Sequence, residues 1–410
     1  SFIDLYEKGR EYRDKAPAIW CPECETAISQ VETEDMEKEA HFNDIEFPLA
    51  SGSGSIMIST TRPELLPACV AIMVHPDDES NAHLAGERAE VPIFDYEVPI
   101  IEDENVDMET GTGVVMVCAF GDQYDIDWYM EHDLPLRVAI DRDGTMTEEA
   151  EEYEGLDRYE MQERIVEDLD EEGYLMDREK ITHTVQVHER DDVEIEFMVT
   201  EQWYIEILDH KDEYLQAGED MDWFPEKMHT RYKNWIEGLK WDWCISRQRD
   251  SGIPFPVWYC DDCGEEIIAA KEDLPVDPIE DNPPTSKCPE CGNEELVPEE
   301  DVFDTWATSS LTPLINAQWT WDEEDEEYTM GRPELYKFDL RPEGHDIISF
   351  WLFHTVVKCM AHTGEVPFEA TMNHGHVLDE NREKMSKSRG NVVTPEEILQ
   401  EFPVDAARYW

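Results

Sequence analysis

The stretch Arg382-Glu-Lys-Met-Ser-Lys-Ser-Arg-Gly390 decides how this sequence of 410 residues is interpreted. It is strongly basic, although the 32 basic and 100 acidic residues of the whole chain give a formal net charge of −68. A basic loop that ends in glycine suits the stabilisation of a departing polyphosphate. No G-x4-G-K-[ST] motif occurs, so a P-loop is excluded as the source of phosphate binding. Taken alone, the stretch also fits an ordinary solvated loop, and other motifs must decide.

The acidic residues are spread along the whole chain, which argues against an acidic tail. Such a charge repels nucleic acids and anionic membranes at ordinary salt. Molar salt would screen it, because the Debye length falls to about 3 Å at 1 M. The composition therefore predicts a halophile protein of the cytoplasm.

The longest strongly apolar stretch, residues 347–357, is too short to span a bilayer. The first residues contain neither an initiating Met nor a signal peptide. We expect no membrane partner, a monomeric state, and a chain that is an internal fragment of a longer protein.

The cysteines indicate metal binding. Two C-x2-C-G knuckles, separated by 24 residues, slightly more than in the usual zinc ribbon, offer four thiolates for a structural Zn²⁺, the alternative being four unrelated buried thiols; the candidate ligands are Cys260, Cys263, Cys288 and Cys291. Another pair, Cys21 and Cys24, has no second C-x2-C pair to meet. His188 and Asp191 are candidates to complete a mixed site, and the pattern leaves this second zinc open.

Three segments differ in texture. Short β-rich runs broken by Pro, Gly and Asp over 56–140 predict a compact β-barrel-like domain. The very acidic segment 147–180 predicts a solvated helix that buries one stripe, formed by Tyr153, Leu156, Tyr159, Ile165 and Leu169. The segment 227–249 is locally basic. A helix with a capping box is expected after Thr394.

Together, several motifs resemble the class I aminoacyl-tRNA synthetases. Lys384-Met-Ser-Lys-Ser388 is similar to the second signature loop of that class. Further motifs resemble those of the isoleucyl, valyl and leucyl subgroup. They are Trp243-Cys-Ile-Ser-Arg-Gln-Arg249, Gly252-Ile-Pro-Phe-Pro-Val-Trp258, Glu343-Gly-His-Asp346 with Phe350-Trp351, Thr60-Thr-Arg-Pro-Glu64, and Gly111-Thr-Gly113 with Asp122 and Asp125. Two more motifs resemble the archaeal valyl branch of this subgroup: Thr200-Glu-Gln-Trp-Tyr204 and Asp304-Thr-Trp-Ala-Thr-Ser-Ser310.

The resemblance implies an α/β fold: a partial Rossmann-like catalytic domain with an inserted β-barrel-rich editing domain and a small zinc-binding insert. The implied domains are a connector with the Cys pair (1–47), the editing domain (48–200), the return into the catalytic core (201–255), the zinc insert (256–300), and the second half of the Rossmann-like domain with the signature loop (301–410). The first signature loop of the class is missing, so we expect the chain by itself to be unable to activate an amino acid.

The resemblance also implies the chemistry. Valine and ATP, with Mg²⁺, would form an adenylate in the full-length enzyme, and the acyl group would pass to tRNA(Val). Lys384 and Lys387 would stabilise the departing pyrophosphate. The adenylate and its side chain would be bound by Glu343, Gly344, Asp346, Trp351, Ser386 and Ser388.

In the editing domain, Asp125 would hold the α-ammonium of mischarged Thr-tRNA(Val), with Asp122 in support. Thr60, Thr61 and Arg62 would line the acyl and adenosine cleft. Leucyl relatives carry a further Thr after the Thr-Thr-Arg-Pro-Glu motif, where this chain has Leu65. Arg247 and Arg249 would contact tRNA.

Two alternatives remain open from the sequence. One is an isoleucyl enzyme. The other is a non-catalytic tRNA-binding paralogue that keeps the motifs only as a scaffold.

Overall fold

The computed structural model describes residues 1–118, 121, 123–132, 134–382, 384–385 and 390–409, and it divides into two compact units. One, here called the β-rich unit, contains Phe2–Glu206 and Trp241–Asp304. The other, the α/β unit, contains Ser1, Ile207–Lys240 and Thr305–Trp410. Among the described residues, we find no helix with the length and hydrophobicity that a membrane crossing requires.

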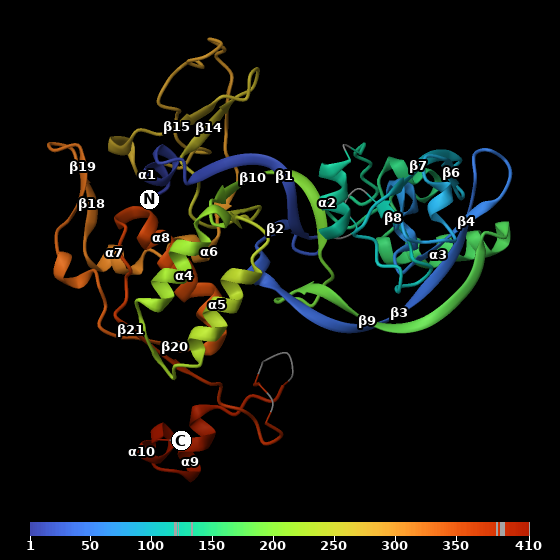
Figure 1. The fold of residues 1–410 in the computed structure, drawn as a ribbon. Helices are drawn as coiled ribbons and strands as arrows, with labels where there is room; N and C mark the ends of the chain where they lie inside the picture. Colours follow the sequence, from blue (N-terminus) through green and yellow to red (C-terminus); the bar gives the residue numbers. More distant parts are fainter. Residues whose placement is uncertain (119–120, 122, 133, 383, 386–389, 410) are drawn as a thin grey trace. The chain divides into compact units, whose positions relative to one another are not determined.

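An antiparallel sheet in the order β12-β10-β1-β2 organises the β-rich unit (Figure 1). Strands β1 and β10 pair continuously from Glu11↔Ile205 to Trp20↔Glu196. Large side chains, among them Trp20 and Tyr204, are buried along these strands and stabilise their pairing. The strands are β1 (Glu11–Cys21), β2 (Thr26–Ile28), β10 (Glu196–Ile205) and β12 (Trp243–Cys244).

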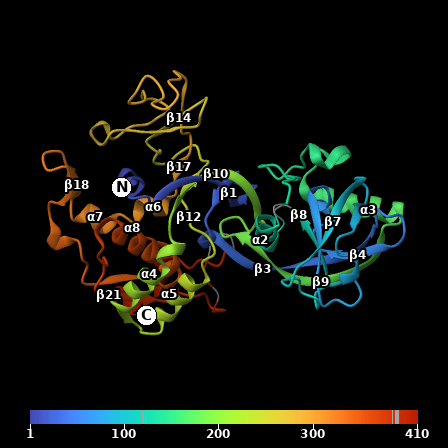
Figure 2. The same cartoon turned by 45° about the horizontal axis from the view of Figure 1, so that its top comes forward.

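A long ribbon follows, made of β3 (Thr33–Pro48) and β9 (Leu175–His188), with β4 (Ser55–Thr60) on the other side of β3 (Figures 1 and 2). Toward the C-terminal end of β3, side chains alternate between buried and partly buried, and Ile45 and Phe47 are fully buried. The pairing starts at Thr33↔His188 and ends at Ile45↔Leu175, with an irregularity at Asp44/Ile45. At this end, the ribbon shares a hydrophobic core with a second sheet.

A second sheet, in the order β6-β7-β5-β8, packs its core with the end of this ribbon. Its central strand β5 is buried at every position, as its apolar sequence predicts. The described strands of this region form open sheets, so they do not form the closed barrel expected from the sequence: alternating short strands do not encode whether a sheet closes. The strands are β5 (Cys69–Val74), β6 (Arg88–Val91), β7 (Tyr96–Glu102) and β8 (Val114–Cys118).

Two helices complete this region, α2 (Gln123–Glu131) and α3 (Arg158–Glu172). The acidic segment does form a helix, α3, which is capped by Asp157 and ends at Gly173 in the left-handed conformation. Met161, Ile165 and Leu169 are buried on one stripe. Tyr159 is 45% exposed, so its predicted place in that stripe is wrong.

The chain then forms the cysteine-bearing insert, a sheet in the order β15-β14-β16. Near it, the aromatic rings of Phe2, Trp203, Phe255 and Phe303 pack against one another. The elements are α1 (Phe2–Glu7), β13 (Ser246–Arg247), β14 (Val257–Cys260), β15 (Glu266–Ile268), β16 (Leu296–Pro298) and β17 (Val302–Phe303).

The α/β unit is built on a parallel sheet in the order β11-β21-β20, which agrees with the α/β class expected from the sequence. The strands are β11 (Asp222–Phe224), β20 (Arg341–Gly344) and β21 (Ala370–His374), with a hairpin of β18 (Trp319–Asp322) and β19 (Glu327–Met330). The helices are α4 (Lys211–Glu219), α5 (Met228–Gly238), α6 (Thr305–Ser309), α7 (Thr312–Asn316), α8 (Phe353–Thr363), α9 (Pro395–Glu401) and α10 (Val404–Tyr409).

Candidate functional site

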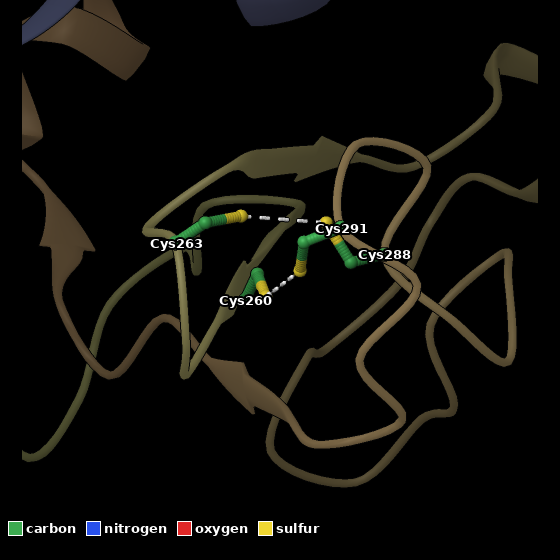
Figure 3. Close-up of side chains that lie close together, drawn as sticks. All are labelled: Cys260, Cys263, Cys288 and Cys291. Carbon is green, nitrogen blue, oxygen red and sulfur yellow. Dashed lines mark hydrogen bonds between the residues drawn. The ribbon is translucent and has the colours of Figure 1, made fainter.

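Four cysteine side chains converge in the insert, as the spacing predicts (Figure 3). The Sγ atoms of Cys260 and Cys291 are 3.4 Å apart, and those of Cys263 and Cys288 are 3.6 Å apart. Tetrahedral Zn²⁺ with Zn–S bonds of about 2.3 Å requires sulfur atoms about 3.8 Å apart. The four thiols therefore fit a zinc ion with little movement.

Each knuckle is shaped by its glycine. Gly264 donates its N–H to the Cys260 carbonyl at 2.9 Å and has a φ of +74°, which favours glycine. Gly292 does the same with Cys288, at 3.0 Å and a φ of +78°. Backbone N–H groups, first that of Cys263, donate to Cys260 Sγ and lower the pKa of this thiol to about 6. The knuckle backbone thus favours the thiolate, which is the form that binds zinc.

A second cluster forms where β1 and β9 end. Cys21, Cys24, His188 and Asp191 lie close enough to share one ion. Asp191 Oδ2 is 3.1 Å from Cys24 Sγ and 3.0 Å from His188 Nδ1. Burial, with the hydrogen bond to Asp191, raises the pKa of Cys24 to about 12. The cluster is either a hydrogen-bonded network of neutral thiols or a mixed metal site, so the sequence question stays open although the four residues do meet.

A pocket of about 590 Å³ lies in the β-rich unit, where the second sheet meets the ribbon. Thr60, Thr61 and Arg62 line it from the end of β4, and Asp125 lines it from α2. Asp125 is buried and accepts the Gly121 N–H at 3.0 Å. Asp122, the other predicted acid, lies outside the described residues. Four of the five predicted editing residues therefore line one pocket.

The ribbon strand β9 supplies further lining residues that the sequence did not single out, including His183 and Gln186. Their alternation along a strand gave no chemical signal, because only the pairing of β9 with β3 brings them to the pocket. Arg62 is held by Glu64 at 2.9 Å and by Glu196 at 2.8 Å. Burial alone would lower the pKa of Arg62, but these two carboxylates outweigh it and raise the pKa.

In the α/β unit, the predicted adenylate residues cluster at the carboxyl end of β20. Glu343 is buried beside β21 and accepts a hydrogen bond from Asn373 Nδ2 at 3.0 Å. Burial raises the pKa of Glu343 to about 8, despite the nearby Arg341 guanidinium. A Cβ on Gly344 would lie 2.4 Å from Asp346 Oδ1, so a larger residue there would require the Asp346 side chain to move. Such a parallel-strand end is where α/β folds bind ligands.

Trp351 is buried, and its Nε1 donates to the Ser309 carbonyl at 3.1 Å, while the Arg341 guanidinium covers its ring. It follows β20 in the π-helical turn η9 (Ile348–Leu352). In the basic loop, Lys384 pairs with Leu378 through the backbone, and its carbonyl accepts from Asn391 at 3.3 Å. Ser386, Lys387 and Ser388 lie outside the described residues, so their predicted roles stay predictions.

Arg247 does not have the surroundings expected of a tRNA contact. Its side chain is 1% exposed and is paired with Glu32 at 2.5 Å and Asp304 at 3.1 Å. Its other terminal nitrogen donates to the backbone carbonyls of Cys244 and Ser246. These contacts assign Arg247 a structural role, in place of the phosphate contact predicted from the sequence.

Arg249 is half-buried, and burial, with the neighbouring Arg190 and Arg247, lowers its pKa. Its contact with tRNA stays a prediction.

Comparisons with known proteins agree with these observations. The profile of the family "tRNA synthetases class I (I, L, M and V)" matches residues 1–410. Proteins named valine–tRNA ligase match the whole chain, at 67% identity in Haloarcula marismortui (46% of that protein), 49% in Methanopyrus kandleri (44%) and 46% in Methanocaldococcus jannaschii (46%). The chain thus spans about half the length of the curated relatives it matches.

Among solved structures, a LeuRS–tRNA–LeuAMS complex from Agrobacterium radiobacter K84 matches 99% of this chain and 55% of that chain. The TM-score is 0.41 and the identity 20%, a likeness that carries no argument.

Proposed function

We propose that this chain, which belongs to the class I tRNA synthetases of the I, L, M and V group, works as part of a valine–tRNA ligase that also hydrolyses Thr-tRNA(Val). The observation that carries the proposal is the match of the whole chain to proteins named valine–tRNA ligase, at up to 67% identity. The residues of the two sites described above supply the chemistry.

The need for hydrolysis follows from size. Threonine and valine are nearly isosteric, and valyl enzymes are known to discriminate between them by only about 10² through binding. A separate pocket that accepts the threonyl ester would supply the remaining selectivity. The pocket of about 590 Å³ in the β-rich unit has the volume for an aminoacyl-adenosine end.

In this pocket, Asp125 would bind the α-ammonium of the substrate, and its burial at the lining supports this role. The hydroxyl groups of Thr60 and Thr61 lie at the same lining, within reach of an acyl side chain or a ribose. Hydrolysis requires a water molecule to attack the ester carbonyl, with the tRNA hydroxyl as the leaving group. The role of the pocket is to hold the ester and that water in register.

For the synthetic reaction, Glu343 and Asp346 would bind the ammonium or the ribose of an adenylate, and Gly344 would leave room for the close approach of the ligand. Lys384 and Lys387 would stabilise the pyrophosphate as the α-phosphate is attacked by the valine carboxylate. Mg²⁺ would accompany ATP as part of the substrate. Trp351 would form a wall of the side-chain pocket.

We further propose that Zn²⁺ is bound by Cys260, Cys263, Cys288 and Cys291 and stabilises the insert. Metal binding supplies folding free energy to a segment with a small apolar core. The domain boundaries given by the resemblance, with editing in 48–200 and zinc in 256–300, belong to this proposal. So do a monomeric state and a cytoplasmic location, where ATP and tRNA are found.

The test is hydrolysis of Thr-tRNA(Val) by this chain in molar KCl, with Asp125→Asn as the variant and Asp127→Asn as the control. Asp127 lies on the same helix, but it is exposed and does not line the pocket. We expect wild type and Asp127→Asn to release threonine and Asp125→Asn to lose most of this activity. Hydrolysis of Val-tRNA(Ile) instead would assign an isoleucyl enzyme. Tight tRNA binding without hydrolysis by the folded protein would favour the non-catalytic paralogue.

A further inference from the structure

We propose that Glu196, together with Arg158, is a positioning residue of the editing pocket. The two residues hold Arg62, and Arg62 in turn keeps the two walls of the pocket at a fixed relative position. The inference rests on the proposed editing function and names residues that no motif of the sequence had indicated. Glu196 and Arg158 do not belong to the described lining of the pocket, so they act through Arg62.

Arg62 joins the two walls. It follows Thr60 and Thr61 directly, and its backbone N–H donates to Thr60 Oγ1 at 3.0 Å. On the opposite wall, its Nη1 approaches the Gly121 carbonyl at 3.4 Å. Gly121 in turn donates its N–H to Asp125 at 3.0 Å. The orientation of the Arg62 guanidinium therefore affects both the threonine wall and the aspartate wall.

Glu196 sets that orientation. It is the first residue of β10 and is 4% exposed. It accepts two hydrogen bonds from Arg62 Nη2, at 2.8 Å to Oε1 and 3.0 Å to Oε2. Glu64 takes the Nε atom of the same guanidinium at 2.9 Å. Two carboxylates thus hold Arg62 from different sides, and a planar guanidinium held in this way has little freedom to rotate.

Arg158 fixes Glu196 in turn. Its Nη1 donates to Glu196 Oε1, and its Nη2 donates to the Glu194 carbonyl at 2.9 Å. Arg158 opens helix α3, and Gln162, one turn later, donates to the Thr61 carbonyl at 3.2 Å and to Glu64 at 3.0 Å. The start of α3 therefore holds the Thr60–Glu64 segment through both the charged cluster and the backbone.

The charge balance of the cluster makes a specific prediction. Arg62 and Arg158 oppose Glu64 and Glu196, so this largely buried group is neutral overall. Removing one charge leaves a buried ion without its partner, which forces the remaining groups to rearrange. Removing Glu196 and Arg158 together restores neutrality and leaves Arg62 paired with Glu64.

The experiment compares Thr-tRNA(Val) hydrolysis by wild type, Glu196→Gln, Arg158→Gln and the double variant in molar KCl, with folding checked by circular dichroism. Glu201→Gln is the control, since Glu201 lies on the same strand, is exposed, and pairs with Arg13 away from the pocket. We expect each single variant to lower kcat about 10- to 100-fold, the loss typical of a reactive geometry displaced by about 1 Å. KM for tRNA should stay within about twofold, because the reacting geometry and not the affinity depends on the cluster.

The double variant should lose less kcat than the product of the two single losses, because the two residues act in one network, whereas residues that act independently would give losses that multiply. Unchanged kcat in Glu196→Gln, or multiplicative losses in the double variant, would overturn the inference. If both single variants fail to fold, Glu196→Asp replaces them: it keeps the charge and shortens the reach, and it must lower kcat at unchanged KM. A folded wild-type chain without any Thr-tRNA(Val) hydrolysis would overturn the proposed function itself, and this inference with it.

Discussion

Replacing Arg247 with methionine is expected to destabilise the β-rich unit and to leave any direct phosphate contact untouched. The guanidinium of Arg247 neutralises Glu32 and Asp304, whose side chains are 6% and 3% exposed. Methionine fills a similar volume but leaves two buried carboxylates without a counter-charge. Breaking a buried ion pair from one side costs about 3–5 kcal/mol, and here two acids lose the same partner.

The assay is urea unfolding in about 2 M KCl, where surface charges are screened. Urea is chosen because guanidinium is itself a salt. Arg88→Met is the matched control: Arg88 pairs with Glu97 at 3.0 Å, but both side chains are about half exposed. The control should lose at most about 1 kcal/mol, since exposed pairs contribute little. Wild-type stability in Arg247→Met, with loss of tRNA binding, would refute the structural role.

The pH dependence gives a second check on the same variant. Burial raises the pKa of Glu32, but Arg247 and the Ser29 N–H outweigh burial, and the pKa is lowered overall. A carboxyl with a lowered folded-state pKa contributes stability above its unfolded pKa of about 4.3, and this is lost as the pH falls. Without Arg247, burial dominates and the charged form is disfavoured. The stability difference between wild type and variant should therefore be largest near neutral pH and shrink below about pH 4.3.

Three further predictions concern other parts of the chain. Cys291→Ser should lower the zinc content, measured by atomic absorption, by one ion per chain. The control Cys118→Ala, at a buried cysteine outside the clusters, should not change the zinc content. Equal zinc contents in both variants would contradict the four-thiolate site. Because Glu343 has a folded-state pKa of about 8, the folded state holds a proton that the unfolded state has lost above about pH 4.3, so stability should fall as pH rises toward 8. Glu343→Gln should flatten that fall in urea unfolding, and an identical slope in the variant would disprove it. Finally, the urea midpoint of wild-type unfolding should rise between about 0.1 and 2 M KCl. The reason is that the acidic residues behind the net charge of −68 repel one another in the folded state, and salt screens this repulsion by shortening the Debye length. A midpoint independent of KCl would show that this repulsion does not limit the stability.

Features encoded by local spacing could be predicted from the sequence. The two C-x2-C-G knuckles meet because each forms its own turn and the pairing of β14 with β16 brings the turns together across the 24 residues that separate them. The capping box predicted after Thr394 is confirmed, since Thr394 and Glu397 bond to each other's backbone at the start of α9. The stripe of α3 was predicted only in part: Ile165 and Leu169 are buried on it, whereas Tyr153 and Leu156 precede the helix and Tyr159 is exposed.

Features that depend on distant pairing were left open by the sequence. His188 and Asp191 were candidates to complete a site with Cys21 and Cys24, but whether the four residues meet depends on the pairing of β9 with β3 from Thr33↔His188 onward. No spacing rule reports that register. Whether the sheet closes could not be predicted for the same reason. Short strands were expected between 56 and 140, but their open arrangement depends on which strands pair with one another.

The arginines carry the more general lesson. From the sequence, Arg247 and Arg249 were expected to contact tRNA. In the structure, Arg62, Arg158 and Arg247 instead neutralise carboxylates that the fold has buried. Salt can screen a carboxylate on the surface, but it does not reach one in the interior, where the cost of an unpaired charge is far larger. A buried acid therefore requires an internal cation or a bound proton at any salt concentration, and the raised pKa of Glu343 is an example of the second. Since the partners lie far apart in sequence, a basic residue of this chain cannot be assigned to tRNA until its burial is known.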